Sequence, residues 1–212
     1  MYRVVTVTAL ALCLSAGTAF SQMGAQRPLS GPGRAATQVA GEWTKTERGN
    51  AYQGGKWIEV TYNRPMLRQR PNIFGSGAEY GKTLLDGGPV WRAGANQTTR
   101  FKTDVPLRFG STTLPAGEYS MLVDLKEKEW TLIMTSQAVQ QKYDPNDKTA
   151  LWGGFNYTPE KDVLRVAMKV ETLPFSVDEL TISFLDVTKA GGRLAIMWDK
   201  TLATVPFMVA GT

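Results

Sequence analysis

The chain has 212 residues, a formal net charge of +5 at pH 7, no histidine and a single cysteine, Cys13. Because Ser-His-Asp triads, Cys-His nucleophiles and His-ligated zinc all need an imidazole, this chain alone cannot build any of them. The positive charge is mild and acidic residues are scattered among the basic ones, so no basic stripe predicts nucleic-acid binding.

Residues 1–21 have the pattern of a secretory signal peptide. Arg3 gives a basic start, an apolar run follows, and small residues surround the expected cleavage after Ser21. The run is shorter than the ~20 apolar residues of a membrane-spanning helix, and lipidation of Cys13 is disfavoured because the bulky Leu12 precedes it. Cleavage leaves 23 basic and 19 acidic residues, a charge of +4, and no cysteine. We therefore expect a periplasmic or secreted protein without a membrane span, disulfide or thiolate metal site.

The mature chain is predicted to have two parts. Residues 22–55 are mostly small and polar, and carry too few bulky apolar side chains to offset the entropy of ordering, so we expect a flexible N-terminal segment. Within it, Trp43 and Tyr52 are aromatic side chains that could dock onto a neighbouring domain. Residues 56–212 are predicted to form a single β-sandwich domain, because the mature chain is long enough to bury one core.

Alternation of apolar and polar residues dominates residues 56–212. It predicts strands with one face in the core, and no long amphipathic helix is evident. The last strand contains Pro206, which cannot donate a ladder hydrogen bond and so suggests a sheet edge. About nine strands with little helix predict an all-β fold, an antiparallel β-sandwich or a jelly-roll-like arrangement. The expected strands span residues 57–63, 99–103, 106–109, 118–125, 130–134, 151–157, 162–170, 179–186, 193–198 and 202–209.

Two segments between these strands hold the residues that are hardest to place. A long loop over residues 66–86 begins among Arg64, Arg68 and Arg70, and loops of this length in compact domains are often functional. Residues 88–99 combine a tryptophan, a cation, two glycines, an amide and paired threonines within a few positions. That combination predicts a constrained corner of the fold.

Several motifs in this chain have a recognisable order and spacing. They are Val60-Thr61-Tyr62-Asn63-Arg64-Pro65, Ile73-Phe74-Gly75, Val90-Trp91-Arg92-Ala93-Gly94-Ala95-Asn96, Leu114-Pro115-Ala116-Gly117-Glu118-Tyr119-Ser120 and Glu129-Trp130-Thr131-Leu132. The set resembles the bacterial domain-of-unknown-function family 2911 over residues 57–209, with its Trp-Arg-x-Gly-Ala-Asn motif intact. The resemblance implies an exported β-rich domain and brings no established activity, cofactor or substrate.

The corner at residues 88–99 has two interpretations. In the structural one, Trp91 fills the core and Arg92 pairs with an interior acid such as Glu118 or Asp162. Gly94 then supplies a positive φ, and the amide of the motif satisfies backbone groups at a bend. In the functional one, a groove binds an anionic or sugar-like ligand through forked arginine bonds and aromatic stacking. The candidate ligand-binding residues are Arg64, Arg68, Arg70, Trp91, Arg92 and Asn96.

The tryptophans also suggest a platform for carbohydrate. Trp130, Trp152 and Trp198 fall at strand positions compatible with core packing, which is where we expect them. Trp43 and Trp57 are not assigned to the core.

Three functions follow from these patterns. The first is a non-catalytic module that binds a small anionic or carbohydrate ligand, and the second is a structural or protein-interaction domain. The third is a carboxylate-dependent glycan hydrolase, because scattered acids could meet in space at glycosidase-like separations, although nothing in their spacing selects a pair. No metal or cofactor is expected, since neither an EF-hand nor a phosphate-binding glycine loop occurs. The acids are Glu59, Glu79, Asp86, Glu118, Asp162, Asp178 and Asp199.

Overall fold

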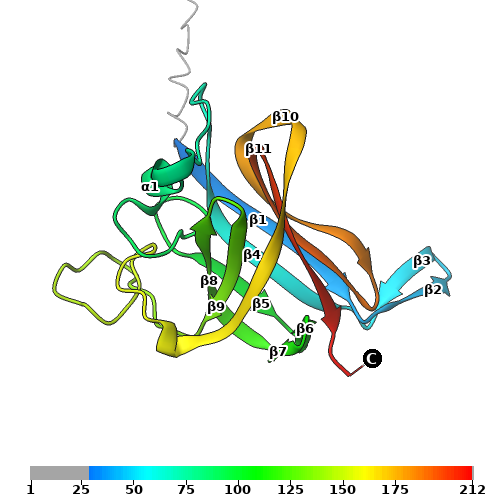
Figure 1. The fold of residues 1–212 in the computed structure, drawn as a ribbon. Helices are drawn as coiled ribbons and strands as arrows, with labels where there is room; N and C mark the ends of the chain where they lie inside the picture. Colours follow the sequence, from blue (N-terminus) through cyan, green and yellow to red (C-terminus); the bar gives the residue numbers. More distant parts are fainter. Residues whose placement is uncertain (1–28, 212) are drawn as a thin grey trace, which may run out of the picture.

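The computed structural model describes residues 29–211 (Figure 1). The signal peptide expected at residues 1–21 lies outside the described residues. The described chain is all-β with three short helical segments, which confirms the predicted fold class, and none of these helices is long and apolar enough to cross a membrane. The elements are β1 (Ser30–Val39), β2 (Glu42–Thr46), β3 (Gly49–Gln53), β4 (Lys56–Pro65), η1 (Gly77–Glu79), α1 (Lys82–Leu85), β5 (Thr99–Thr103), β6 (Leu107–Phe109), β7 (Thr112–Leu114), β8 (Gly117–Lys126), β9 (Glu129–Thr135), η2 (Pro159–Lys161), β10 (Asp162–Thr188) and β11 (Gly191–Val209).

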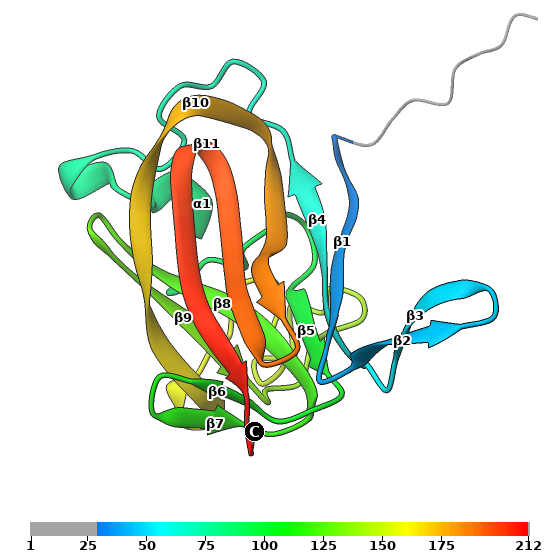
Figure 2. The ribbon, with the colours of Figure 1, turned by 90° about the vertical axis from the view of Figure 1, so that its right-hand side faces the viewer.

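One curled antiparallel sheet forms the body of the protein. Its strands follow the order β1-β4-β5-β8-β9-β10-β11-β6-β7, and Figure 2 shows β10 and β11 bending over the body. The end of β10 reaches back to β1 and β4. The Ala40 amide, just after β1, donates to the Lys189 carbonyl at 2.8 Å, and the Ile182 amide donates to the hydroxyl of Tyr62 in β4 at 2.9 Å. The core is therefore enclosed by one continuous sheet that nearly closes on itself.

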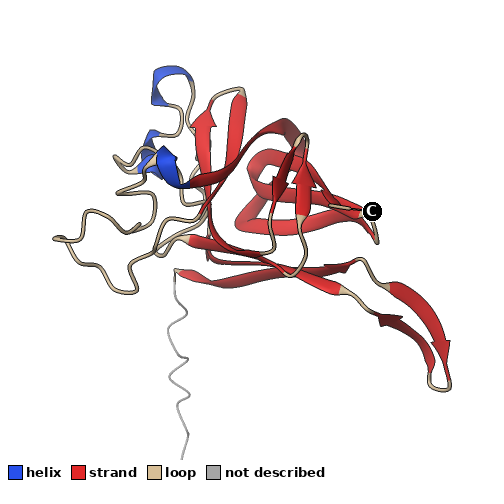
Figure 3. Cartoon of the chain, turned by 90° about the horizontal axis from the view of Figure 1, so that it is seen from below, coloured by secondary structure: helices blue, strands red, loops and turns tan. Residues whose placement is uncertain are grey.

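The hairpin of β2 and β3, residues 42–53, forms a separate two-stranded sheet that we call the arm. It projects from one end of the body, whereas the helical segments and long loops gather at the other end (Figure 3).

Residues 29–55, the described part of the N-terminal segment, differ from the flexible segment expected over residues 22–55, of which residues 22–28 lie outside the described residues. Residues 30–39 form β1, which pairs with β4 in unbroken register from Ser30 opposite Pro65 to Val39 opposite Lys56. Only Ala35 and Val39 of this strand are buried, so its side chains give little apolar pattern. Its order comes from backbone hydrogen bonds to a neighbouring strand, which composition does not reveal. β1 is thus part of the folded body.

The two longest strands replace four shorter predicted ones. β10 has 27 residues and β11 has 19, and they pair with each other from Lys169 opposite Thr204 to Thr188 opposite Gly191. The register shifts on either side of Val177, as expected where bulges bend a strand. The bulged stretch lacks regular alternation, which is why the sequence divides each strand in two.

The prediction that Pro206 marks a sheet edge is wrong. β11 lies between β10 and β6. Thr204 pairs with Lys169 of β10, and Met208 pairs with Arg108 of β6, so Pro206 sits between the two runs of pairing. Neither run includes Pro206, so its missing backbone N–H removes no ladder hydrogen bond and a proline is tolerated there.

The core has a compact aromatic centre. The Trp91 and Trp198 rings stack with centroids 6.4 Å apart, and Phe74 meets Trp91 edge-on at 5.9 Å and Trp130 at 4.9 Å. The indole of Trp130 donates to the Tyr80 hydroxyl at 2.8 Å, so the loop before α1 is fixed to the same cluster. Aromatic packing of this kind stabilises a core beyond the area it buries.

A second, smaller core lies under the segment at residues 136–158. It contains Val90, Leu122, Ile133 and Leu151, on the face of the sheet opposite the aromatic centre. The strand predicted over residues 151–157 is not formed, because that stretch turns back on itself and makes only isolated bridges.

Candidate functional site

The corner at residues 88–99 is a structural element of the core. Trp91 is 1% exposed, and its backbone exchanges two 2.8 Å hydrogen bonds with Val123 of β8. The positive φ angles of the corner fall on Ala93 and Asn96, at 48° and 58°, and not on Gly94 as predicted. Gly94 is needed for close approach instead, because a Cβ there would lie 3.1 Å from the Asn63 carbonyl oxygen.

Arg92 closes this corner. Its Nη1 donates to the Asn96 carbonyl oxygen at 2.9 Å. A Cβ added to Gly153 would lie 2.8 Å from Cζ of Arg92, so glycine at position 153 leaves room for the guanidinium. Burial lowers the pKa of the Arg92 guanidinium, and the charge of Asp86 acts in the opposite direction. The predicted partners Glu118 and Asp162 pair elsewhere.

Groups of the protein hold the side chains of Arg64 and Arg70 and the backbone of Arg68. Arg64 forms an ion pair with Glu179 at 3.0 Å. The backbone amide of Arg68 donates to the Asp178 carboxylate at 3.1 Å, and the Arg70 guanidinium donates to two carbonyls of its own loop at 2.9 and 2.7 Å. These contacts attach the loop to β10, and they occupy the guanidinium groups of Arg64 and Arg70 with groups of the protein.

Three of the acids that suggested a hydrolase form ion pairs with arginines. Glu59 pairs with Arg34, Glu118 with Arg100 at 3.1 Å, and Asp162 with Arg165 at 3.0 Å. The hydrolase interpretation stays a prediction without a specific pair of carboxylates.

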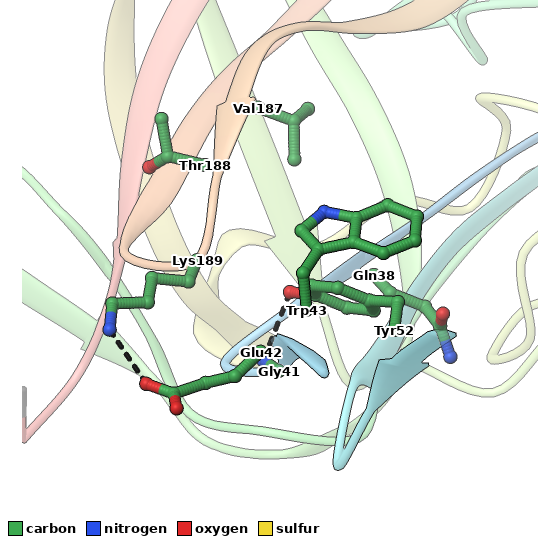
Figure 4. A pocket seen from close by; sticks show the side chains of 8 residues that line it. All are labelled: Gln38, Gly41, Glu42, Trp43, Tyr52, Val187, Thr188 and Lys189. Atoms are coloured by element: carbon green, nitrogen blue, oxygen red, sulfur yellow. Dashed lines mark hydrogen bonds and ion pairs between the residues drawn. The ribbon is translucent and has the colours of Figure 1, made fainter. Parts of the chain in front are cut away.

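A surface groove opens where the arm joins the body. Its volume is about 720 Å³, and Figure 4 shows the two rings of the arm facing the turn between β10 and β11. The groove thus brings together residues more than a hundred positions apart in sequence. It is lined by Gln38, Gly41, Glu42, Trp43, Tyr52, Val187, Thr188 and Lys189.

Two aromatic rings form the wall of this groove. Trp43 is 71% exposed, and its ring lies 5.5 Å from that of Tyr52 at an angle of 60°. The Tyr52 hydroxyl accepts a 3.0 Å hydrogen bond from the Gly41 amide. A Cβ on Gly41 would lie 2.5 Å from the Tyr52 ring, so glycine at this position lets the ring lie against the backbone. The wall is therefore set in place by the junction between β1 and β2.

The charged groups of the groove neutralise each other. Lys189 Nζ lies 2.8 Å from Glu42 Oε1, which ties the arm to the end of β10 (Figure 4). The hydrogen bond from Lys189 holds the pKa of Glu42 below its ordinary value, and the same bond raises the pKa of Lys189. Within residues 29–211 the side-chain amide of Gln38 and the indole N–H of Trp43 make no hydrogen bond. These two groups are free to meet a ligand.

The sequence points to only part of this site. Trp43 and Tyr52 stand out as aromatics in a polar segment, but the segment itself is predicted to be flexible. Lys189 and Val187 carry no pattern that links them to residue 43. Their meeting depends on the long-range contact between β1 and β10, which no local pattern encodes.

Together, the fold and the groove define an all-β protein with a nearly closed antiparallel sheet and an exposed aromatic site. The chain belongs to the family described as "Protein of unknown function (DUF2911)", which matches residues 45–207 and confirms the resemblance drawn from the motifs. No curated protein and no solved structure matches this chain. The matched residues begin after Trp43, so part of the groove lies outside them.

Proposed function

We propose that the protein is a non-catalytic binding module, and that it binds a neutral, sugar-like ligand in the groove between the arm and the β10–β11 turn. The observation that carries the proposal is the 71% exposed Trp43 on the wall of a groove of about 720 Å³. An exposed tryptophan in a concave site with nearby polar groups is typical of ligand recognition.

The composition of the groove favours a sugar over an apolar or an anionic ligand. The faces of the two rings offer apolar surface for the C–H groups of a pyranose, and the free amide of Gln38 offers both a donor and an acceptor for hydroxyls. The only cation lining the groove, Lys189, is already paired with Glu42. An anionic ligand would therefore have to break that pair, whereas a neutral ligand would not.

The alternative face, built from Arg64, Arg68, Arg70 and Arg92, has less support. Arg64, Arg70 and Arg92 donate to groups of the protein, and the loop that carries Arg68 is attached to Asp178. The export expected from residues 1–21 is part of the proposal, because it would place the groove among envelope or extracellular glycans.

Affinity electrophoresis tests the proposal directly. The purified protein is run through native gels that contain one neutral polysaccharide each, such as xylan, laminarin or galactomannan. We expect retardation in at least one gel, and loss of affinity by about tenfold or more in Trp43→Ala, as for other tryptophans at the centre of a binding site.

Phe175→Ala is the control. Phe175 is also an exposed aromatic side chain, at 58%, but it lies within β10 and does not line the groove. It should bind like the wild type. Equal loss in both variants, retardation unaffected by Trp43→Ala, or no retardation in any gel would contradict the proposal.

A further inference from the structure

A second pocket, with a different chemistry, lies in the segment at residues 136–158. This segment is on the opposite side of the body from the arm (Figure 1). The pocket has a volume of about 300 Å³ and no part in the proposed function. It is lined by Tyr143, Asp144, Pro145, Asp147, Lys148, Trp152, Phe155 and Asn156.

Three aromatic side chains line this pocket. The rings of Tyr143 and Trp152 lie 5.5 Å apart at an angle of 47°, and Tyr143 is 57% exposed. Trp152 and Phe155 pair across a tight turn through two backbone hydrogen bonds of 3.3 and 3.0 Å, which puts both side chains on one side of it. Trp152 is thus half-buried in a pocket wall, and not a core residue as its sequence position predicts.

Amide side chains hold the pocket in shape. Gln140 is 7% exposed; its Nε2 donates to the Asp147 carbonyl at 3.0 Å, and its Oε1 accepts from the Asp144 amide at 2.9 Å. Asn156 donates to the same Asp147 carbonyl at 2.9 Å. Buried amides that are satisfied in this way fix a loop in one conformation. The pocket is therefore preformed, which lowers the cost of binding.

The charge at the rim is negative and unpaired. Asp144, Asp147 and Lys148 give a net charge of −1, and none of the ion pairs within residues 29–211 includes any of the three. Hydrogen bonds from the backbone amides of Ala150 and Thr149, and from the Thr149 hydroxyl, hold the pKa of Asp147 below its ordinary value. Asp147 thus stays ionised in neutral solution.

We propose that this pocket is a binding site for a quaternary ammonium group, with the faces of Tyr143, Trp152 and Phe155 as the cage and Asp144 and Asp147 as the counter-charge. A cation is attracted to the negative face of an aromatic ring, and a methylated ammonium also has the apolar surface that such rings cover. A neutral aromatic ligand would leave the rim carboxylates unused, and an anion would be repelled by them.

Choline is the probe for this site, and its neutral isostere 3,3-dimethylbutan-1-ol is the control ligand. The two have the same shape and differ in the charge of one atom. NMR spectra of the ¹⁵N-labelled full chain, with the indole signal of Trp152 assigned from Trp152→Phe, report binding at the pocket. We expect a saturable shift of that signal with choline and none with the isostere.

Two exposed-ring variants sharpen the test without disturbing the fold. Tyr143→Ala removes one face of the cage and should weaken choline binding by about fivefold to thirtyfold, whereas Tyr143→Phe keeps the face and should stay within about twofold of wild type. Phosphatidylcholine vesicles, compared with free choline, show whether the group is also accepted as a lipid headgroup. No saturable shift with choline, equal binding of the isostere, or full affinity in Tyr143→Ala would overturn the proposal.

The proposal for this pocket and the proposal for the arm groove can be tested independently. Trp43→Ala should leave choline binding unchanged, and Tyr143→Ala should leave polysaccharide binding unchanged, because the two pockets share no residue.

Discussion

The corner at residues 88–99 and the arm groove are both built around a tryptophan, and they use it in opposite ways. Trp91 is 1% exposed and packs in the aromatic centre, while Trp43 is 71% exposed and packs mainly on Tyr52. Around Trp91 the polar groups bind each other, as Arg92 binds the Asn96 carbonyl. Around Trp43 an amide and an indole N–H are free. The motif around Trp91 thus serves the packing of the core, whereas the polar groups without a hydrogen-bond partner around Trp43 can bind a ligand.

The largest contrast should be in stability. Trp91→Ala leaves a cavity between Phe74, Trp130 and Trp198 and should lower the free energy of unfolding by about 3–5 kcal/mol. Trp43→Ala removes a surface ring and should stay within about 0.5 kcal/mol of wild type. Urea denaturation of both variants measures the difference. Similar losses in the two would mean that the arm is as integral to the body as the corner.

A smaller effect separates the two interpretations of Arg92. Arg92→Met keeps most of the apolar stem but loses the bond to the Asn96 carbonyl, and should lower the free energy of unfolding by about 1–2 kcal/mol. Polysaccharide binding should be unchanged. Unaltered stability together with lost binding would instead restore the corner as the ligand site.

The smallest effect concerns the ion pair that ties the arm to β10. The pKa of Glu42 is lowered from 4.5, so its contribution to stability is complete above pH 4.5 and is lost as the pH falls through the lowered value. The pKa of Lys189 is raised from 10.5, so its contribution is present below pH 10.5 and is lost as the pH rises through the raised value. NMR titration of the Glu42 carboxyl carbon should give a midpoint below 4.5, and Lys189→Met should return it toward 4.5. An unchanged midpoint in that variant would show that the pair does not form in solution.

Local patterns predict the parts of the fold in which local interactions decide the structure. The alternation over residues 57–63 appears as β4, and the hairpin around residues 126–128 appears as β8 and β9. β1 is not predicted, because its order comes from pairing with β4. β10 is predicted as two strands, because the bulges near Val177 interrupt its alternating pattern.

The candidate sites were harder to predict for the same reason. Trp91 and Arg92 attract attention because their motif is unusual, yet the structure uses them for packing. The groove needs the long-range contact of β1 with β10, and the second pocket needs hydrogen bonds from the side chains of Gln140 and Asn156 to the Asp147 carbonyl within an irregular segment. Neither arrangement follows from the spacing of residues along the chain.

The closing contact between β1 and the end of β10 also constrains how the chain acquires its shape. The Ala40 amide must find the Lys189 carbonyl, and β6 must find the end of β11, about a hundred residues away. Loops of this size close slowly, because chain entropy is spent before the contacts form. During synthesis the sheet therefore cannot be completed before β10 and β11 have been made. Until then, β4 is the strand with which β1 can pair. The groove lies across the contact between β1 and the end of β10, so we expect it to form late in folding.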